Sequence, residues 1–211
     1  MGAKNLIILG GGGHAAVLAD TIQQQLSYSL VGFLDDNESR MSLLGIPRLG
    51  KLTSFIDKIP LTTTLVLGVG HVGKKILAKE IVKLYKEAGF IFETIISKHA
   101  TVSPHARLEE GSCVMSGAVI QTNTTIGKYV IINTGATIDH NCIIGDYTHV
   151  APGCSISGDV SIGKDCLVGI GATIIQGITI ADNCIIGAGA VVVQNCTESG
   201  TYVGVPAKKI N

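Results

Sequence analysis

An aliphatic residue stands at every sixth position from Val102 to Val192, and no insertion breaks the phase. Two positions before each of these residues, a second series holds mostly small residues, such as Ala118, Cys142 and Thr148. Residues two apart on a strand point to the same side, so both series should face inward together. A period of six fits neither an α-helix nor a heptad coiled coil. The repeat therefore predicts a solenoid of short β-strands.

Three six-residue units would close one triangular coil, so the repeat predicts a left-handed parallel β-helix of about five coils. The aliphatic residue fills each coil, and the small residue leaves room at the corner. The position after the aliphatic residue is often glycine, and we expect these glycines to adopt positive φ. They are Gly127, Gly145, Gly163, Gly169 and Gly187.

The cysteines fit the same pattern, because Cys142, Cys154, Cys166 and Cys184 all belong to the small inward series. A buried free cysteine behaves as a small apolar residue, which favours packing over nucleophilic catalysis. The six cysteines include no CxxC pair, so neither a zinc site nor a redox pair is indicated. Without an export signal, we expect reduced thiols and a cytoplasmic protein.

The charge of the chain is balanced, with 16 Lys and Arg residues against 16 Asp and Glu residues. Such a chain has no electrostatic footprint for nucleic acid or for an anionic membrane. The mean hydropathy is positive at +0.43, yet no apolar run is long enough to predict a spanning helix. The expected partner is a small molecule or another protein.

The first 97 residues alternate strand and helix patterns, which predicts a small Rossmann-like α/β domain with a parallel sheet. Residues 98–211 then form the β-helix domain and a C-terminal tail. Strands are expected at residues 5–9, 30–34 and 65–67, and helices at residues 15–25 and 76–88.

A glycine-rich turn, Gly10 to Gly13, follows the first expected strand. Gly10, Gly12 and Ala15 satisfy a relaxed dinucleotide pattern, with Asp35 after the second strand. A domain of about ninety residues is too short for the two halves that a dinucleotide needs. The glycines would instead admit a phosphate or a sugar close to a helix N-terminus, or they only make a tight turn.

Together these motifs resemble a known family. The repeat and the ending from Tyr202 to Ile210, with Gly-Val-Pro-Ala-Lys, resemble the hexapeptide-repeat acyltransferases. The Gly-Gly-Gly-His-Ala turn, Phe-Leu-Asp-Asp-Asn and Gly-Val-Gly-His resemble the sugar O- and N-acyltransferases of bacterial glycan synthesis. This family includes UDP-4-amino-sugar and perosamine N-acetyltransferases and sialic-acid O-acetyltransferases. The resemblance covers essentially the whole chain and implies an acetyl-coenzyme A-dependent homotrimer.

The resemblance also implies which N-terminal residues contact a nucleotide-sugar. They are Gly12, Gly13, His14, Asp35 and Asp36, with Lys51 and Gly68 as weaker candidates. His71 is open between a loop role and a substrate contact.

Two histidines interrupt the middle of the repeat. Neither His140 nor His149 belongs to an inward series, so both should project from the prism surface. Acyl transfer from a thioester needs a base for the attacking group and donors for the developing oxyanion. Histidine suits the role of base near neutral pH. The two lie half a coil apart in sequence, so one site that uses both would need a neighbouring subunit.

By the resemblance, His140 is the general base. The family commonly has an acidic residue directly after this histidine, and Asn141 stands there instead, which leaves Asp139 as a possible acidic partner. By the same resemblance, acetyl-coenzyme A contacts His149, Gly158, Ile170 and Ala188, which should rise through successive coils along the coenzyme arm. No metal is implied, because the histidines show no close ligand cluster.

The sequence thus predicts direct acetyl transfer from acetyl-coenzyme A to an amino group of a nucleotide-activated sugar. One alternative is O-acetylation of a sialic-acid-like sugar. Another, from a different class, is a catalytically silent β-helix that binds a sugar nucleotide.

Overall fold

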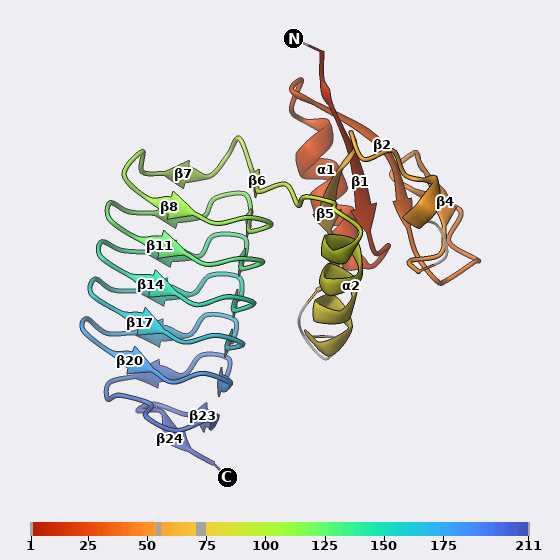
Figure 1. Cartoon of the computed structure of the whole chain (residues 1–211). Coiled ribbons are helices and arrows are strands. Elements are labelled where there is room, and N and C mark those ends of the chain that lie inside the picture. Colours follow the sequence, from red (N-terminus) through yellow and green to blue (C-terminus); the bar gives the residue numbers. More distant parts are fainter. Residues whose placement is uncertain (1, 54–55, 71–74, 211) are drawn as a thin grey trace. The chain divides into compact units, whose positions relative to one another are not determined.

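The computed structural model describes residues 2–53, 56–70 and 75–210. Contacts divide the chain into two compact units, Met1–Lys98 and His99–Asn211. This division lies next to the boundary predicted between residues 97 and 98. The fold class predicted from the sequence is confirmed, with a small α/β unit followed by a parallel β-helix (Figure 1).

The first unit is built around a sheet with strand order β3-β4-β2-β1-β5. Strands β1, β2, β4 and β5 are parallel, whereas β3 pairs antiparallel with β4. Its elements are β1 (Lys4–Leu9), α1 (Gly13–Gln23), β2 (Tyr28–Leu34), β3 (Ser42–Leu43), β4 (Ile46–Gly50), the 3₁₀ turn η1 (Ile56–Lys58), β5 (Thr64–Leu67), α2 (Lys75–Glu87) and β6 (Ile95–Ile96).

The three expected strands and two expected helices all form. The second half of β1 is buried without alternation, as a central parallel strand should be. Helix α1 buries Ala15, Leu18, Ala19 and Ile22, spaced three to four residues apart as on one helix face. The short β3–β4 hairpin was not predicted. In the described part of the chain, neither helix has the length and apolarity to cross a membrane.

The second unit consists almost entirely of two-residue strands at six-residue spacing. They are β7 (Thr101–Val102), β8 (Arg107–Leu108), β9 (Cys113–Val114), β10 (Val119–Ile120), β11 (Thr125–Ile126), β12 (Ile131–Ile132), β13 (Thr137–Ile138), β14 (Ile143–Ile144), β15 (His149–Val150), β16 (Ser155–Ile156), β17 (Ser161–Ile162), β18 (Leu167–Val168), β19 (Thr173–Ile174), β20 (Thr179–Ile180), β21 (Cys184–Ile186), β22 (Val191–Val192), β23 (Gly200–Val203) and β24 (Lys208–Lys209).

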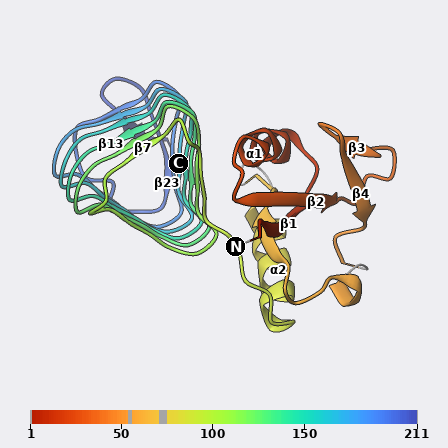
Figure 2. The same ribbon diagram turned by 90° about the horizontal axis from the view of Figure 1, so that it is seen from above.

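Every third strand stacks in one of three parallel sheets. One sheet runs β22-β19-β16-β13-β10-β7, the second runs β20-β17-β14-β11-β8, and the third includes β23-β21-β18-β15-β12-β9. The register places each residue beside the one eighteen positions later, as Ile120 beside Ile138. Figure 2 shows the coils superposed around a common interior. The last strand, β24, pairs antiparallel with β23.

The interior contains the two series that the sequence predicts. The aliphatic residues from Val114 to Val192 are buried, and Cys142, Cys154, Cys166 and Cys184 pack among them. Burial raises the pKa of the Cys166 thiol to about 11, so it stays protonated and unreactive at neutral pH. The packing role predicted for these four cysteines is confirmed.

Polar members of the small series have a second role. Their side chains donate to carbonyl oxygens fifteen residues later, as Thr148 Oγ1 to Gly163 O at 2.8 Å and Cys154 Sγ to Gly169 O at 3.0 Å. The Thr148 hydroxyl also accepts from Cys166 N at 3.0 Å. One buried hydroxyl therefore satisfies two backbone groups of the next coil.

Replacing Thr148 by valine should lower the free energy of unfolding by about 1–3 kcal/mol. Valine keeps the shape of threonine but leaves Cys166 N and Gly163 O without the hydroxyl in a dry interior. Denaturant unfolding of the variant measures the effect. Thr148→Ser, which keeps the hydroxyl, is the control and should stay closer to the wild type. Equal loss in both variants would mean that the methyl group matters instead.

The conformation expected for the glycines after the strands is wrong. Positive φ occurs instead three residues before each aliphatic residue from Val114 to Val192, as at Asn141 (58°) and Gly153 (67°). Glycine is needed after the strand because successive coils approach closely there. A Cβ on Gly145 would lie 2.6 Å from the carbonyl carbon of Gly163. The requirement at these positions is therefore steric.

Candidate functional site

His140 lies at a corner of the β-helix, between β13 and β14, and is half-buried. Its imidazole covers the backbone of Gly158 in the next coil. A Cβ on Gly158 would lie 2.5 Å from Cε1 and 2.6 Å from Nε2 of this ring. The side chain thus occupies the space that any residue other than glycine would fill, so Gly158 positions His140.

The side chain of Asn141 lies between the His140 ring and the Asp159 carboxylate and contacts both. Asn141 Nδ2 lies 3.1 Å from His140 Nδ1 and donates to Asp159 Oδ1 at 3.0 Å. Asn141 has a φ of 58°, in the left-handed region that asparagine tolerates better than most residues. The carboxylate of Asp159 therefore lies near His140, but the amide of Asn141 stands between the carboxylate and the ring.

Asp159 was missed by the sequence analysis, although it stands eighteen residues after Asn141 and hence directly beneath it in the stack. Hydrogen bonds from Asn141 and from Gln176 hold the pKa of the Asp159 carboxyl below its usual range. Asp159 is therefore a carboxylate at neutral pH. Asp139, the acidic partner considered from the sequence, instead accepts from the His140 backbone N–H at 2.8 Å.

A shallow groove of about 300 Å³ lies beside this corner, on the outer face of β10, β13 and β16. Its lining is mixed polar and apolar, and it includes Asp139, the residue before His140. The lining residues are Val119, Gln121, Thr137, Ile138, Asp139, Ser155, Ile156 and Ser157. The groove could accommodate part of a ligand next to the imidazole.

His149 takes an outward position of β15, next to the inward Val150, but neighbouring residues cover it, and only 9% of its surface is exposed. It lies in β15 between Ile131 and Leu167 of the neighbouring coils. The outward positions of this sheet are partly apolar, and Ile131 is also buried. His149 Nε2 lies 3.1 Å from Asn133 Nδ2. Burial lowers the pKa of His149 from 6.5 to about 4, so the ring is neutral at physiological pH.

This burial predicts a loss of stability in mild acid. An unfolded histidine binds its proton near pH 6.5, whereas folded His149 does so near pH 4. Between these values the unfolded chain holds more protons, so the full contribution is present above pH 6.5 and declines as the pH falls, by up to about 3 kcal/mol. Unfolding titrations from pH 7 to pH 4 measure this slope. A His149→Gln variant should lack this component, and an unchanged slope would contradict it.

The residues assigned to the coenzyme by resemblance do not form one line along a single chain. Gly158 stacks under His140, whereas Ile170 and Ala188 stack at another corner, where Gly189 N donates to Ile170 O at 2.8 Å. Ile170 is 64% exposed and Ala188 is also exposed. These residues do lie in later coils, as the sequence predicts, but at different corners of one chain.

In the first unit, the glycine-rich turn leads from β1 into the N-terminus of α1. Gly12 is the N-cap residue and no side chain caps the helix. Both Gly12 and Gly13 are exposed and lack positive φ, and a Cβ on either would meet open space. The fold therefore does not require glycine at these positions, whereas close approach of a ligand would. His14 follows them in the first turn of α1 and is half-buried.

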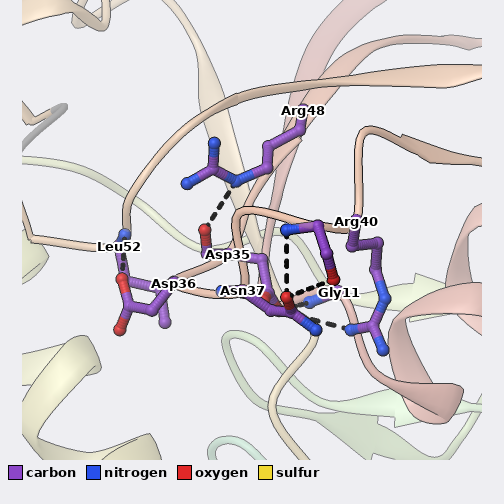
Figure 3. A network of polar contacts seen from close by, with 8 residues as sticks. Gly11, Asp35, Asp36, Asn37, Arg40, Arg48 and Leu52 are labelled. Atoms are coloured by element: carbon purple, nitrogen blue, oxygen red, sulfur yellow. Dashed lines mark hydrogen bonds and ion pairs between the residues drawn. The ribbon is translucent and has the colours of Figure 1, made fainter.

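The two aspartates after β2 differ in their contacts (Figure 3). Asp35 accepts from Gly11 N at 2.6 Å and from Asn37 N at 2.7 Å, so it joins the glycine turn to its own loop. Asp36 accepts from Leu52 N at 3.0 Å and is otherwise exposed. Asp36 is thus the more accessible of the two.

Two arginines that the sequence analysis did not select complete this cluster. Arg40 Nη1 lies 3.6 Å from Asp35 Oδ2, and Arg48 Nε donates to Asp35 O at 2.8 Å. Arg48 comes from β4, in the hairpin that was not predicted, so periodicity gave no signal for it.

The two weaker candidates for a nucleotide-sugar contact, Lys51 and Gly68, differ in exposure. Lys51 is exposed and pairs with Glu38 at 2.7 Å, next to the loop of Asp36. Gly68 is buried, and a Cβ on it would collide with Ile8 and Ala15, so it serves close packing of β1 and α1. His71 lies outside the described residues. Across residues 2–53, 56–70 and 75–210, no group of three or more His, Cys, Asp or Glu side chains could hold a metal ion.

Comparison with family models gives three matches along the chain. Residues 5–81 match the PglD N-terminal domain. Residues 123–158 match the bacterial transferase hexapeptide model of six repeats, and residues 159–194 match the hexapeptide repeat of succinyl-transferase. The comparison with curated proteins returned no match.

Solved structures match both units at once. The acetyltransferase domain of PglB from Neisseria gonorrhoeae FA1090, in complex with acetyl coenzyme A, is 33% identical, with a TM-score of 0.92 over 99% of this chain and 100% of that chain. PerB from Caulobacter crescentus, in complex with CoA and GDP-perosamine, is 33% identical, with a TM-score of 0.88 over 98% and 97%. WeeI from Acinetobacter baumannii AYE is 25% identical, with a TM-score of 0.89 over 99% and 100%.

Proposed function

Because the chain belongs to the family of bacterial sugar acetyltransferases that join a PglD N-terminal domain to hexapeptide repeats, we propose that it transfers an acetyl group from acetyl-coenzyme A to an amino group of a nucleotide-activated sugar. The observation that carries this proposal is the match over 98% of the chain to an enzyme with CoA and GDP-perosamine bound. That match includes both the unit with the glycine turn and the unit with His140.

In the proposed reaction, the amine attacks the thioester carbonyl directly, without an acyl-enzyme intermediate. The protonated state of the buried thiols supports this proposal, since burial raises the pKa of Cys142, Cys154 and Cys166. His140 stands beside the groove and contacts the reacting groups. The general-base role predicted from the resemblance requires a free lone pair on the ring nitrogen that faces the amine, and hence the hydrogen on the other ring nitrogen.

The nucleotide-sugar would bind at the glycine turn of the first unit. The N–H groups at the start of α1 and the open space beside Gly12 and Gly13 suit a phosphate group. Asp36 and Lys51 border the same loop and are exposed. Asp35 would act indirectly, since its carboxylate accepts from two backbone N–H groups.

We further propose that the enzyme is a homotrimer with sites between subunits. His140 and Gly158 share one corner of the coil, whereas Ile170 and Ala188 share another. A site that uses both corners therefore needs two chains. Sedimentation equilibrium should give three times the mass of the chain. A fully active monomer would contradict this assembly.

The function is tested with acetyl-coenzyme A and a panel of UDP-, dTDP- and GDP-linked amino-sugars, with thiol release as the readout. Sialic acid tests the O-acetylation alternative, and the corresponding nucleotide-sugars with a hydroxyl in place of the amine control for amine specificity. We expect release only with an amine acceptor. Turnover of sialic acid alone would support O-acetylation, and nucleotide-sugar binding without any turnover would indicate a silent β-helix.

A further inference from the structure

The contact of the His140 ring with Asn141 determines which ring nitrogen carries hydrogen. The Asn141 side-chain atom that faces His140 Nδ1 at 3.1 Å is also the atom that faces Asp159 Oδ1 at 3.0 Å. An amide side chain can offer either its oxygen or its NH₂ group at such a position. The chemistry of the partners decides between the two orientations.

Asp159 fixes the orientation of this amide. Its side chain is exposed, where an aspartate is ionised at neutral pH, and Gln176 Nε2 donates to its Oδ2 at 3.0 Å, so Asp159 is a carboxylate that only accepts hydrogen bonds. An amide oxygen at 3.0 Å from a carboxylate oxygen would be repelled, so the NH₂ group must face Asp159. On the other side, Asn123 Nδ2 lies 3.4 Å from Asn141 Oδ1, a contact that is compatible with this orientation.

An amide NH₂ group has two hydrogens and no lone pair to accept a hydrogen bond. One hydrogen goes to Asp159 Oδ1, and the other points at His140 Nδ1. Nδ1 must then accept, so it carries no hydrogen. A neutral imidazole without hydrogen at Nδ1 carries it at Nε2.

We propose that the Asp159–Asn141 pair holds neutral His140 as the Nε2–H tautomer, so that this histidine serves acetyl transfer as a hydrogen-bond donor to the thioester oxygen instead of as the general base. The proposal rests on the acetyl-transfer function proposed above. His140 is then the catalytic residue, and Asn141 and Asp159 are positioning residues that act through it.

The reaction balances without a base at His140. A neutral amine forms the N–C bond to the thioester carbonyl, and the electron pair of the C=O double bond moves to oxygen. His140 Nε2–H donates to this oxyanion. The C=O double bond re-forms, the C–S bond breaks, and the departing thiolate takes the proton lost by the attacking nitrogen through water. The products are the amide and the free thiol of coenzyme A.

The tautomer is measured directly by long-range ¹H–¹⁵N correlation NMR on the full chain, at about pH 8, where an ordinary imidazole is neutral. The ring nitrogens with and without hydrogen have well-separated ¹⁵N shifts. The His140→Ala spectrum assigns the signals among the six histidines. We expect the pattern of Nε2–H for wild-type His140. An Nδ1–H pattern in the wild type would overturn the proposal.

An exchange of the two positioning side chains gives the sharpest variant. Asn141→Asp combined with Asp159→Asn keeps the net charge and puts the acceptor next to His140 Nδ1. Both positions have positive φ, 58° and 59°, which asparagine and aspartate tolerate. We expect the exchange to move the hydrogen from Nε2 to Nδ1 and to lower kcat about 100-fold, because removal of one oxyanion donor has effects of this size. The KM values for both substrates should stay within about twofold.

The control for a change from asparagine to aspartate at such a corner is Asn183→Asp, since Asn183 is exposed, has a φ of 59° and lies in a later coil. It should keep the wild-type kcat and folding.

A second variant, His140→Gln, can donate through its amide but cannot act as a base at neutral pH. It should therefore retain more activity than His140→Ala.

The outcomes separate this inference from the proposed function. If the exchange moves the hydrogen to Nδ1 while kcat stays the same or rises, His140 acts as a base and the donor role is wrong. If His140→Gln is no better than His140→Ala, the donor role is also contradicted. The NMR result needs no substrate, so absence of any acetyl transfer alongside an Nε2–H pattern would reject the proposed function and leave the tautomer assignment standing.

Discussion

An alanine at position 158 should lower kcat for acetyl transfer about 100-fold and leave the β-helix folded. Its Cβ would lie 2.5–3.0 Å from three atoms of the His140 ring, so the ring must rotate away from the groove. A displacement of about 1 Å of a catalytic group can lower a rate by this factor. Gly158 lacks positive φ, so the backbone accepts alanine without strain. Steady-state kinetics and circular dichroism of Gly158→Ala test both parts.

A double-mutant cycle identifies the route of this effect. If Gly158 acts only by making room for His140, then Gly158→Ala should change the residual rate of His140→Ala by less than about twofold. The resemblance assigns Gly158 a contact with acetyl-coenzyme A instead. A rise in KM for acetyl-coenzyme A that persists in the double variant would support that contact and contradict the steric role.

Replacing Gly145 by alanine should lower the free energy of unfolding by about 3 kcal/mol, near the upper end for overpacking. The new Cβ would lie 2.6 Å from Gly163 C and from Lys164 N, both backbone atoms of the next coil. A backbone cannot move aside as a flexible side chain does, and Gly145 N donates to Ile162 O at 2.8 Å in the same place. Denaturant unfolding at fixed protein concentration measures the loss.

Asparagine distinguishes a steric requirement from a conformational one. At Gly153, where φ is 67° and a Cβ would meet open space, asparagine should be tolerated better than alanine. At Gly145, asparagine should be at least as harmful as alanine, because only size matters. Rescue of the Gly145 position by asparagine would show that the backbone there needs the left-handed region, as the sequence alone suggested.

The fold could be predicted because one repeat governs it. The six-residue period determines which residues face inward, and burial of the series from Val114 to Val192 follows from that period alone. The contact between coils could not be predicted in the same way. It depends on how closely two backbones approach. The sequence does not distinguish a glycine that is needed for its positive φ, such as Gly153, from one that is needed because a Cβ would collide with the next coil, such as Gly145.

The candidate site was predictable only in part. The eighteen-residue period places Asp159 beneath Asn141, so the acidic group near His140 could have been found by counting one coil ahead. The burial of His149 could not, because an outward position is solvated only where its neighbours leave it uncovered. Asp35 was also indistinguishable from Asp36 in sequence, since their difference lies in which backbone N–H groups each carboxylate meets.

A stack of parallel coils exposes open strand edges at its ends, and such edges can add further strands from other molecules. In the third sheet the antiparallel strand β24 covers β23, through the pairs Tyr202 with Lys209 and Val203 with Lys208. The reversed direction breaks the parallel register that another coil would need, and Lys208 and Lys209 are exposed. Strand β24 thus covers the end of the third sheet and disfavours the addition of another parallel coil there.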